Sequence, residues 1–424
     1  MTIRHLIVLE VFALLLTSST FCTAQSPAAT VNVRLPQRDV VGEIHSIDET
    51  CVKIQVGEKQ LEFLPSEVFE LGAIQEHAGR PWIVLTHGEV IVVDKVTLGV
   101  ADIVGDSLTW KKFRCPLEMV QAVLYQPPHD LLARDELMQT VVAHDMRGED
   151  GIVLQDGTTL TGKLNVLDDR RLALTATGLK IPVEFSVSAV RAVYFAREVE
   201  KAEPSNEVQQ FGFNNGSYGG AKNVIRDRGK LVWQTVSGLK LETLPPFLDS
   251  EIASFNPWSA VSYYRPVGKK LLFLHDVKPT QYHYVPIFKS VSDKPIARDY
   301  GLGRNAVGGT LRVDGKLYLA GVGMVSVSRL TFDIPAGYTR FRSDVGIDSR
   351  AAEQGSVSVH VLLQGKQGSE WRTAYDSPVV RGGDDLRSID VPLGDARRLS
   401  LVVDMADRAD ILDYANWVNA RFVK

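Results

Sequence analysis

The stretch that decides the fold is DMADRADILDYANWVNARFVK, residues 404–424. It follows Leu399, Leu401 and Val403, an alternation that places one face of a strand in a core and the other in water. The stretch itself begins with aspartates at every third position and ends in an aromatic and aliphatic run. We therefore expect a strand, an acid-rich loop and a closing strand at the end of the chain.

Reading back from this stretch, residues 271–424 are dense in strand signals. The Asp314–Gly315 pair between Arg312 and Tyr318 favours a two-residue hairpin turn. Alternating apolar residues recur in residues 330–334, 341–347 and 357–361. Several such strands at close spacing predict a β-sandwich.

The first half repeats a different plan in residues 41–69, 82–125 and 150–195. Each segment consists of short strands separated by polar turns and closes with an apolar run, which predicts small β units similar to SH3-like or Sm-like barrels. A pattern that starts after Asp130 predicts a short helix between the second and third units. Residues 197–210 are charged, contain Pro204 and lack periodicity, which is typical of a linker.

The N-terminus has the pattern of a secretory signal peptide. Arg4 precedes an apolar run over residues 6–16, and small residues allow cleavage after Ala24. A retained anchor is the alternative, but the run is short for a membrane span of about 20 residues. We expect residues 1–24 to be removed and the protein to be exported to the periplasm, the cell surface or the medium.

Charge and cysteine content exclude other classes. The net charge is -4 with mixed signs, so the sequence offers no basic field for nucleic acid, and no later run is long and apolar enough to cross a bilayer. The mature chain keeps only Cys51 and Cys115, which excludes a disulfide scaffold. The two cysteines could form one disulfide bridge or could be two buried free thiols, and the sequence leaves both alternatives open.

Short motifs of the C-terminal part occur in a specific order. They are Gly321-Val322-Gly323, Ser328-Arg329-Leu330, Asp344-Val345-Gly346-Ile347-Asp348 and Asp413-Tyr414-Ala415-Asn416-Trp417. In this order they resemble the NPCBM module, the carbohydrate-binding module first noted at the N-terminus of glycoside hydrolase family 98 enzymes. The resemblance implies a galactose-binding-like jelly-roll that binds glycans without cleaving them. Tyr414 and Asn416 depart from the His and Asp of the common closing motif.

The pattern and the resemblance together predict an all-β fold, in which repeated small β-barrel-like units precede a C-terminal jelly-roll β-sandwich. The expected organisation is two small β units in residues 39–127, a short helix and third β unit in 128–196, and a linker in 197–210. A transitional β segment in 211–270 and the NPCBM-like sandwich in 271–424 follow.

Candidate sugar ligands are aromatic rings, which stack on pyranose faces, and planar polar groups, which fix hydroxyls. The candidates in the sandwich are Tyr282, Tyr284, Trp371, Tyr375, Asn416 and Trp417. Core packing is the alternative for Trp417, and packing against a neighbouring unit for Tyr282 and Tyr284.

The aspartates of the acid-rich loop are a second set of candidates. Asp404, Asp407, Asp410 and Asp413 could supply the oxygen ligands that calcium prefers. Their spacing is not that of an EF-hand, and a solvated acidic loop is the alternative.

Catalytic motifs are missing from the sequence. There is no Gly-x-Ser-x-Gly elbow and no His-Glu-x-x-His helix, and the neighbouring carboxylates Asp168–Asp169 and Asp384–Asp385 fall in turn contexts. We therefore predict that the protein is not an enzyme but an exported carbohydrate-binding protein whose partner is a glycan or a glycoprotein.

Two alternatives stay open. One is a structural or protein-interaction component of the cell envelope, which a dry apolar interface between the halves would favour. The other is a glycan-cleaving hydrolase with an unrecognised site, which a buried carboxylate pair in an interdomain cleft would favour. An exposed aromatic beside Asn, Arg or Asp on the sandwich would favour binding.

Overall fold

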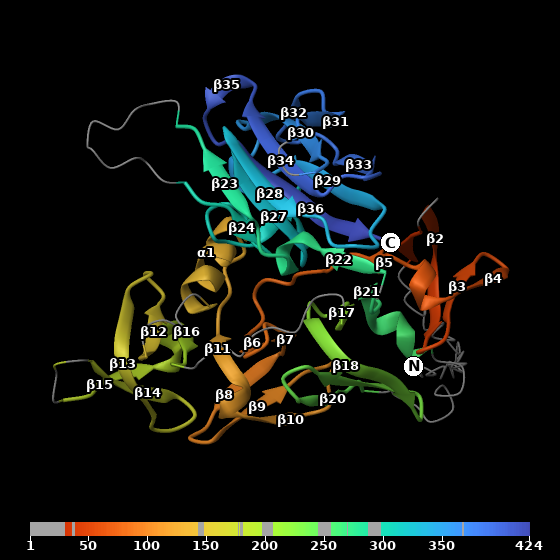
Figure 1. The fold of residues 1–424 in the computed structure, drawn as a ribbon. Helices are drawn as coiled ribbons and strands as arrows, with labels where there is room; N and C mark the ends of the chain where they lie inside the picture. The colour runs from red at the N-terminus through yellow and green to blue at the C-terminus, as the bar shows by residue number, and fades with distance from the viewer. Residues whose placement is uncertain are drawn as a thin grey trace, which may run out of the picture.

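The protein is described by a computed structural model that covers residues 30–35, 39–142, 148–176, 178, 181–196, 207–244, 256–268, 270–286, 298–366 and 369–424. The predicted signal peptide and residues 197–206 of the predicted linker lie outside this part of the chain. The described residues are nearly all β, as predicted, with barrel-like units first and a sandwich last (Figure 1).

Four barrel units make up the first part. Unit 1 contains β1 (Thr30–Arg34), β2 (Asp39–Ile47), β3 (Val52–Val56), β4 (Lys59–Phe63), η1 (Pro65–Glu67) and β5 (Glu70–Gly72). Unit 2 contains β6 (Trp82–Leu85), β7 (Val90–Val92), β8 (Lys95–Leu98), β9 (Asp102–Asp106), β10 (Phe113–Pro116), η2 (Leu117–Met119) and β11 (Val120–Leu124).

The other two units follow the same order. Unit 3 contains β12 (Asp150–Leu154), β13 (Thr159–Val166), β14 (Arg171–Ala176), β15 (Val183–Ser186), η4 (Val187–Ala189) and β16 (Val190–Tyr194). Unit 4 contains β17 (Gln209–Phe213), β18 (Tyr218–Asp227), β19 (Lys230–Thr235), β20 (Lys240–Glu242), η5 (Pro257–Ala260) and β21 (Val261–Arg265). The segment expected to be transitional is thus built on the plan of the units before it.

Every unit closes in the same way. A 3-10 helix precedes its last strand, and that strand pairs antiparallel with the first one, in β1–β5, β6–β11, β12–β16 and β17–β21. Such closure leaves few exposed strand edges. Strands of different units also pair, in β11–β16, β5–β21 and β7–β18, so the units share one large sheet.

Helix α1 (Leu131–Val142) connects units 2 and 3. Asp130 accepts a hydrogen bond from the backbone amide of Ala133 at 2.8 Å, the usual way in which an aspartate begins a helix. Leu137 and Val141 are buried against Trp82 of unit 2 and other apolar side chains. Among the described helices none is long and apolar enough to span a membrane.

The C-terminal part is a sandwich of two six-stranded sheets. Sheet 1 has the order β24 (Gly301–Leu302), β27 (Gly321–Val325), β36 (Tyr414–Val423), β29 (Arg340–Ile347) and β33 (Arg387–Pro392), with β22 (Leu271–Phe273) also on β36. Sheet 2 has the order β23 (Gln281–Tyr284), β28 (Ser328–Asp333), β34 (Arg398–Met405), β30 (Ser356–Gln364) and β31 (Trp371–Asp376), with β32 (Val380–Arg381) on β30.

The alternating residues of the sequence fill the space between these sheets. Leu399, Leu401 and Val403 are fully buried there, as expected from their spacing. The hairpin of β25 (Leu311–Val313) and β26 (Lys316–Tyr318) turns at Asp314 and Gly315, which both have positive φ, the conformation that a two-residue turn of this kind requires.

The predicted acid-rich loop differs from the structure. Its first residues complete β34, and residues 407–410 form the short strand β35 (Asp407–Asp410) before β36 begins at Tyr414. The backbone of Asp404 and Met405 still pairs with β30, so strand pairing extends into this polar segment. Cys51 and Cys115 are not bonded to each other, and Cys115 is buried in the core of the barrel units.

The sandwich packs directly on the barrel units (Figure 1). The guanidinium group of Arg312, at the base of the sandwich, lies 2.8 Å from Asp135 of α1 and 2.6 Å from Glu76. Burial disfavours its charge, but hydrogen bonds with both carboxylates outweigh burial and raise the pKa of Arg312. Asn419 of β36 also donates to Glu70 of unit 1. The two parts are therefore joined by buried polar contacts.

Candidate functional site

Two of the predicted ligand residues are fully buried on opposite faces of β36. Asn416 is fully buried and donates from Nδ2 to Asp348 at 2.6 Å and to the carbonyl of Arg312 at 3.1 Å. Trp417 is part of the core between the sheets. Both residues belong to β36, which is buried on both of its faces, so a glycan cannot reach either side chain.

Tyr282 and Tyr284 lie on edge strand β23 and share one side of it, as their spacing predicts. That side faces the sandwich: Tyr282 packs on its core, and its hydroxyl donates to the carbonyl of Arg298 at 2.9 Å. Burial is the main cause that raises the pKa of Tyr282 to about 12. Tyr375 also packs against the core, so Tyr282 and Tyr375 contribute mainly to packing.

Two of the four aspartates are held by protein groups. Asp413 accepts hydrogen bonds from Ser326 Oγ and from the amide of Ser356, both at 2.9 Å. Burial raises the pKa of Asp413. Asp407 accepts from Arg381 Nε at 2.8 Å.

The remaining aspartates do not complete a metal site with them. The side chain of Asp404 points away from the sandwich core, on the outer face of sheet 2, where its carboxylate lies 3.4 Å from His360 Nε2. No group of three or more His, Cys, Asp or Glu side chains in the described part of the chain is arranged to hold a metal ion. Calcium binding by Asp404, Asp407, Asp410 and Asp413 therefore stays a prediction, and the positions of these side chains give it no further support.

Trp371 is the predicted ligand residue that lies at the surface. It starts edge strand β31 and is partly exposed on the outer face of sheet 2. The guanidinium carbon of Arg329 lies 4.1 Å from the indole centroid, and that of Arg398 lies 5.5 Å from it. Ser400 accepts from Arg329 Nε at 3.1 Å, and Gln364 accepts from Arg398 at 3.2 Å. We call these five residues the Trp371 cluster.

The register of sheet 2 assembles the Trp371 cluster. Leu330 and Leu399 point into the core, so their neighbours Arg329 and Arg398 must point outward. Burial and the charge of Arg398 lower the pKa of Arg329. The two arginines were missed at the sequence level, although each stands next to a residue of the alternating apolar pattern.

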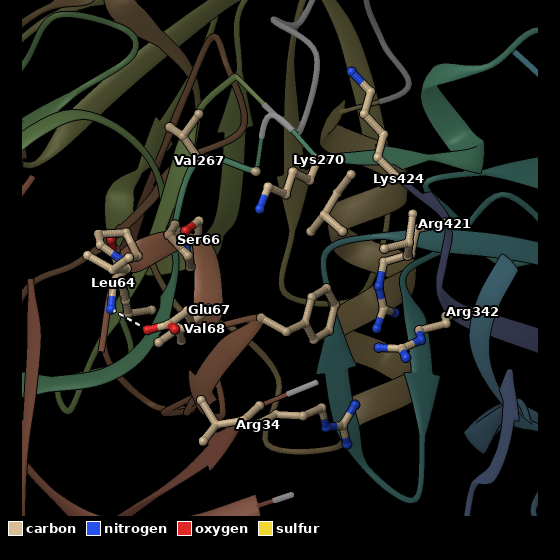
Figure 2. A pocket seen from close by; sticks show the side chains of 18 of the residues that line it. Arg34, Leu64, Ser66, Glu67, Val68, Val267, Lys270, Arg342, Arg421 and Lys424 are labelled. Carbon is tan, nitrogen blue, oxygen red and sulfur yellow. Dashed lines mark hydrogen bonds between the residues drawn. The ribbon is translucent and has the colours of Figure 1, made fainter. Parts of the chain in front are cut away.

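A second candidate lies between the sandwich and barrel units 1 and 4. It is a cavity of about 1380 Å³, which we call the interdomain cavity (Figure 2). Its charged lining residues, among those described, are Arg34, Asp39, Asp48, Glu49, Glu67, Lys270, Arg340, Arg342, Asp344, Asp390, Arg421 and Lys424. No sequence signal predicted it, because its walls come from segments up to about 390 residues apart.

Part of this charge is neutralised within the protein. Arg34 Nη1 lies 2.9 Å from Asp344 and 3.2 Å from Glu70. Burial raises the pKa of Glu70, although three arginines oppose it. Arg340 and Arg342 both contact Asp390, at 2.7 and 3.0 Å.

Comparison with known proteins matches the C-terminal part of the chain. The model of the NPCBM/NEW2 domain family matches residues 286–423, which include most of the sandwich. A Renibacterium salmoninarum protein named as an endo-alpha-N-acetylgalactosaminidase is 28% identical over 131 residues, which are 30% of this chain. The match spans only 8% of that relative's length.

Solved structures with some similarity include carbohydrate-binding modules. CBM51 of Clostridium perfringens GH95, in complex with methyl-galactose, is 19% identical and aligns over 36% of this chain and 99% of its own, with a TM-score of 0.30. CBM51-2 and INT domains of Clostridium perfringens ZmpB, in complex with GlcNAc, are 20% identical over 48% of this chain and 40% of theirs, with a TM-score of 0.31.

Proposed function

We propose that this protein is an exported, non-catalytic carbohydrate-binding protein that recognises glycans or glycoproteins through its C-terminal sandwich. The observation that carries the proposal is the Trp371 cluster on a sandwich that the NPCBM/NEW2 family model matches. Export rests on the sequence pattern of residues 1–24 alone.

The chemistry of the Trp371 cluster suits a sugar. An indole offers a flat apolar surface for the C–H groups of a pyranose ring, and guanidinium groups donate hydrogen bonds to hydroxyl oxygens. Gln364 and Ser400 are buried and hold the two arginines in place by accepting hydrogen bonds from them. The cluster places a partly exposed aromatic ring beside two arginines on the sandwich, which supports the binding proposal.

The hydrolase alternative has one observation in its favour. Glu70 and Asp344 are two buried carboxyl groups, and Asp344 lines the interdomain cavity. Both, however, contact the same Arg34, an arrangement typical of an ion-pair network, whereas hydrolysis needs two carboxyl groups on opposite sides of the bond to be cleaved. Chromatography of each bound oligosaccharide after long incubation tests it: intact sugar is expected, and release of a smaller sugar would favour the enzyme.

Substitution of Trp371 tests the site. Trp371→Ala is expected to weaken glycan binding about tenfold, equivalent to roughly 1.4 kcal/mol, because it removes the stacking surface. Trp371→Phe keeps a ring and is the matched control. Isothermal titration calorimetry measures the affinity of each full-length variant for a glycan that the wild type binds.

Tyr282→Ala is the structural counterpart. Because Tyr282 packs on the core, this variant is expected to lose about 1–3 kcal/mol of unfolding free energy while the folded fraction keeps its affinity. Equal affinity of the wild type and Trp371→Ala would refute the assignment of the Trp371 cluster, and a specific loss in folded Tyr282→Ala would move the site to β23.

A further inference from the structure

The interdomain cavity has a basic wall that the protein does not neutralise. Figure 2 shows Arg342 and Arg421 next to each other on the sandwich side, with Lys270 and Lys424 nearby. Both lysines are exposed, and no described carboxylate forms an ion pair with them or with Arg421. Four cations therefore line one wall, although the ammonium group of Lys424 also lies 5.5 Å from the ring centroid of Tyr338. Among the described residues only Arg342 of these four has an acidic partner, Asp390.

Arg421 is the distinctive member of this wall. Its side chain is only 8% exposed, and its guanidinium group lies 3.6 Å from the ring centroid of Phe69. It donates to the carbonyl of Asn419, but its Nε has no hydrogen-bond partner among the described residues, and neither has Nε of Arg342. A buried donor without a partner is unfavourable, so a ligand that accepts a hydrogen bond from it gains affinity.

The charge state of Arg421 agrees with this geometry. Burial is the main cause that lowers its pKa to about 10, and the nearby positive charge of Arg342 acts in the same direction. The negative charges of Glu70 and Asp344 do not offset these effects. An anionic group on the basic wall would stabilise the charged form.

The opposite wall of the interdomain cavity carries negative charge. Glu67, after β4, faces the cavity from the side of unit 1 and accepts from the backbone amide of Leu64 at 2.8 Å (Figure 2). Asp48 and Glu49 also line this side. Carboxylates accept hydrogen bonds from sugar hydroxyls but repel a second anion. A small inorganic anion would use only one wall of a cavity that exceeds the roughly 300–1,000 Å³ typical of small-ligand sites.

We propose that the interdomain cavity binds an oligosaccharide that carries a carboxylate or a sulfate group. The acidic group lies against Lys270, Arg421 and Lys424, and the hydroxyls lie toward Glu67. This inference rests on the proposed function for the choice of a glycan, but it assigns a second site, separate from the Trp371 cluster and built jointly by the barrel units and the sandwich.

The test uses full-length protein and three probes of equal length. A heparin-derived hexasaccharide carries sulfates, hexagalacturonate carries carboxylates only, and maltohexaose is neutral. We expect one or both acidic probes to bind in a calorimetric titration, with affinity falling as salt is raised, and maltohexaose to show no binding that depends on the cavity. Failure of both acidic probes to bind the wild type would overturn the proposal.

Variants locate the binding. The double variant Lys270→Gln/Lys424→Gln is expected to weaken binding of the acidic probe about tenfold, and both changes are at exposed positions. The control Lys163→Gln/Lys222→Gln removes the same charge at exposed positions outside the cavity and away from the Trp371 cluster, and it is expected to bind like the wild type. Arg421→Met, with its fold checked by circular dichroism, is expected to weaken binding at least as much.

The outcomes separate this inference from the proposed function. Equal weakening in both lysine double variants would show only long-range attraction and would overturn the inference. Loss in Trp371→Ala but not in Lys270→Gln/Lys424→Gln would place acidic sugars at the Trp371 cluster, which would overturn the inference and leave the proposed function standing. Loss in the cavity variants alone supports the inference even where Trp371→Ala has no effect.

Discussion

His275 is a buried titratable residue between the barrel units and the sandwich. It lies in η6 (Leu274–Asp276), 5.6 Å from the ring of Phe273. Burial, with a smaller effect of the positive charge of Arg265, lowers the pKa of His275 to about 3, although Asp276 lies 3.7 Å from Nε2. The folded protein therefore keeps this imidazole neutral at pH values where an unfolded histidine, with a pKa near 6.5, is charged.

This difference predicts a loss of stability in acid. Between pH of about 6.5 and about 3 the unfolded state binds a proton at His275 and the folded state does not, so the unfolding free energy falls as pH falls, by at most about 1.4 kcal/mol per unit. His275→Gln is expected to flatten the slope, whereas exposed His45→Gln leaves it unchanged. Urea unfolding from pH 7 to 4 measures this, and identical slopes in wild type and His275→Gln would contradict it.

Single residues also show how far sequence reasoning reaches. The alternation of Leu399, Leu401 and Val403 was enough to predict which side chains are buried, because the period of a strand is local. The burial of Asn416 depends on Asp348, 68 residues away, and no local pattern reports such a partner. Trp371 was found as an aromatic, but its arginine neighbours depend on strand register.

Strand β22 shows where the sandwich begins as a structural element. Leu271, Leu272 and Phe273 pair with Val423, Phe422 and Arg421 of the last strand. Leu274, which follows directly, is fully buried in the sandwich core. The family match starts at residue 286, so it leaves out these residues.

A pair of fragments tests the contribution of β22. We expect residues 278–424 to be less stable than residues 271–424 by about 2–5 kcal/mol, since the shorter fragment keeps β23 but lacks the buried Leu274 and the strand beside β36. Urea unfolding followed by tryptophan fluorescence compares the two. Equal midpoints would mean that β22 belongs to the barrel part and not to the sandwich.

Elements were predictable where their signal is short-range. The hairpin at Asp314–Gly315 and the helix after Asp130 follow from turn and capping residues alone. The acid-rich segment was expected to be a loop because aspartates are rare in strands, but pairing of Asp404 with β30 extends β34 into it. Tertiary pairing overrides a weak local preference in this case.

In the whole molecule the joint between barrel units and sandwich depends on Arg312. We expect Arg312→Met to cost about 3–5 kcal/mol of unfolding free energy, because it leaves Asp135 buried without its cation and leaves Glu76 with only the more distant Arg134, at 3.7 Å. Arg340→Met, at a half-exposed ion pair with Asp390, is the control and is expected to cost less than about 1 kcal/mol. A cost for Arg312→Met as small as that of the control would contradict the role of this contact.

The class and order of the parts could be predicted from the sequence, but not the surfaces that they form together. Arg312 and Asp135 are 177 residues apart, and Asn419 and Glu70 are 349 apart. The local sequence around each of these residues does not indicate its distant partner. The interdomain cavity therefore emerges only when the barrel units and the sandwich are assembled (Figure 1).

Glycan recognition is the central claim, and a glycan-array screen of the intact chain after removal of residues 1–24, with and without calcium, tests it most directly. We predict reproducible binding to a defined group of glycans in at least one of the two conditions, and a comparison of the two conditions tests the predicted calcium binding by Asp404, Asp407, Asp410 and Asp413. Absence of binding to any glycan by folded protein in both conditions would contradict the account and would favour a structural role in the cell envelope.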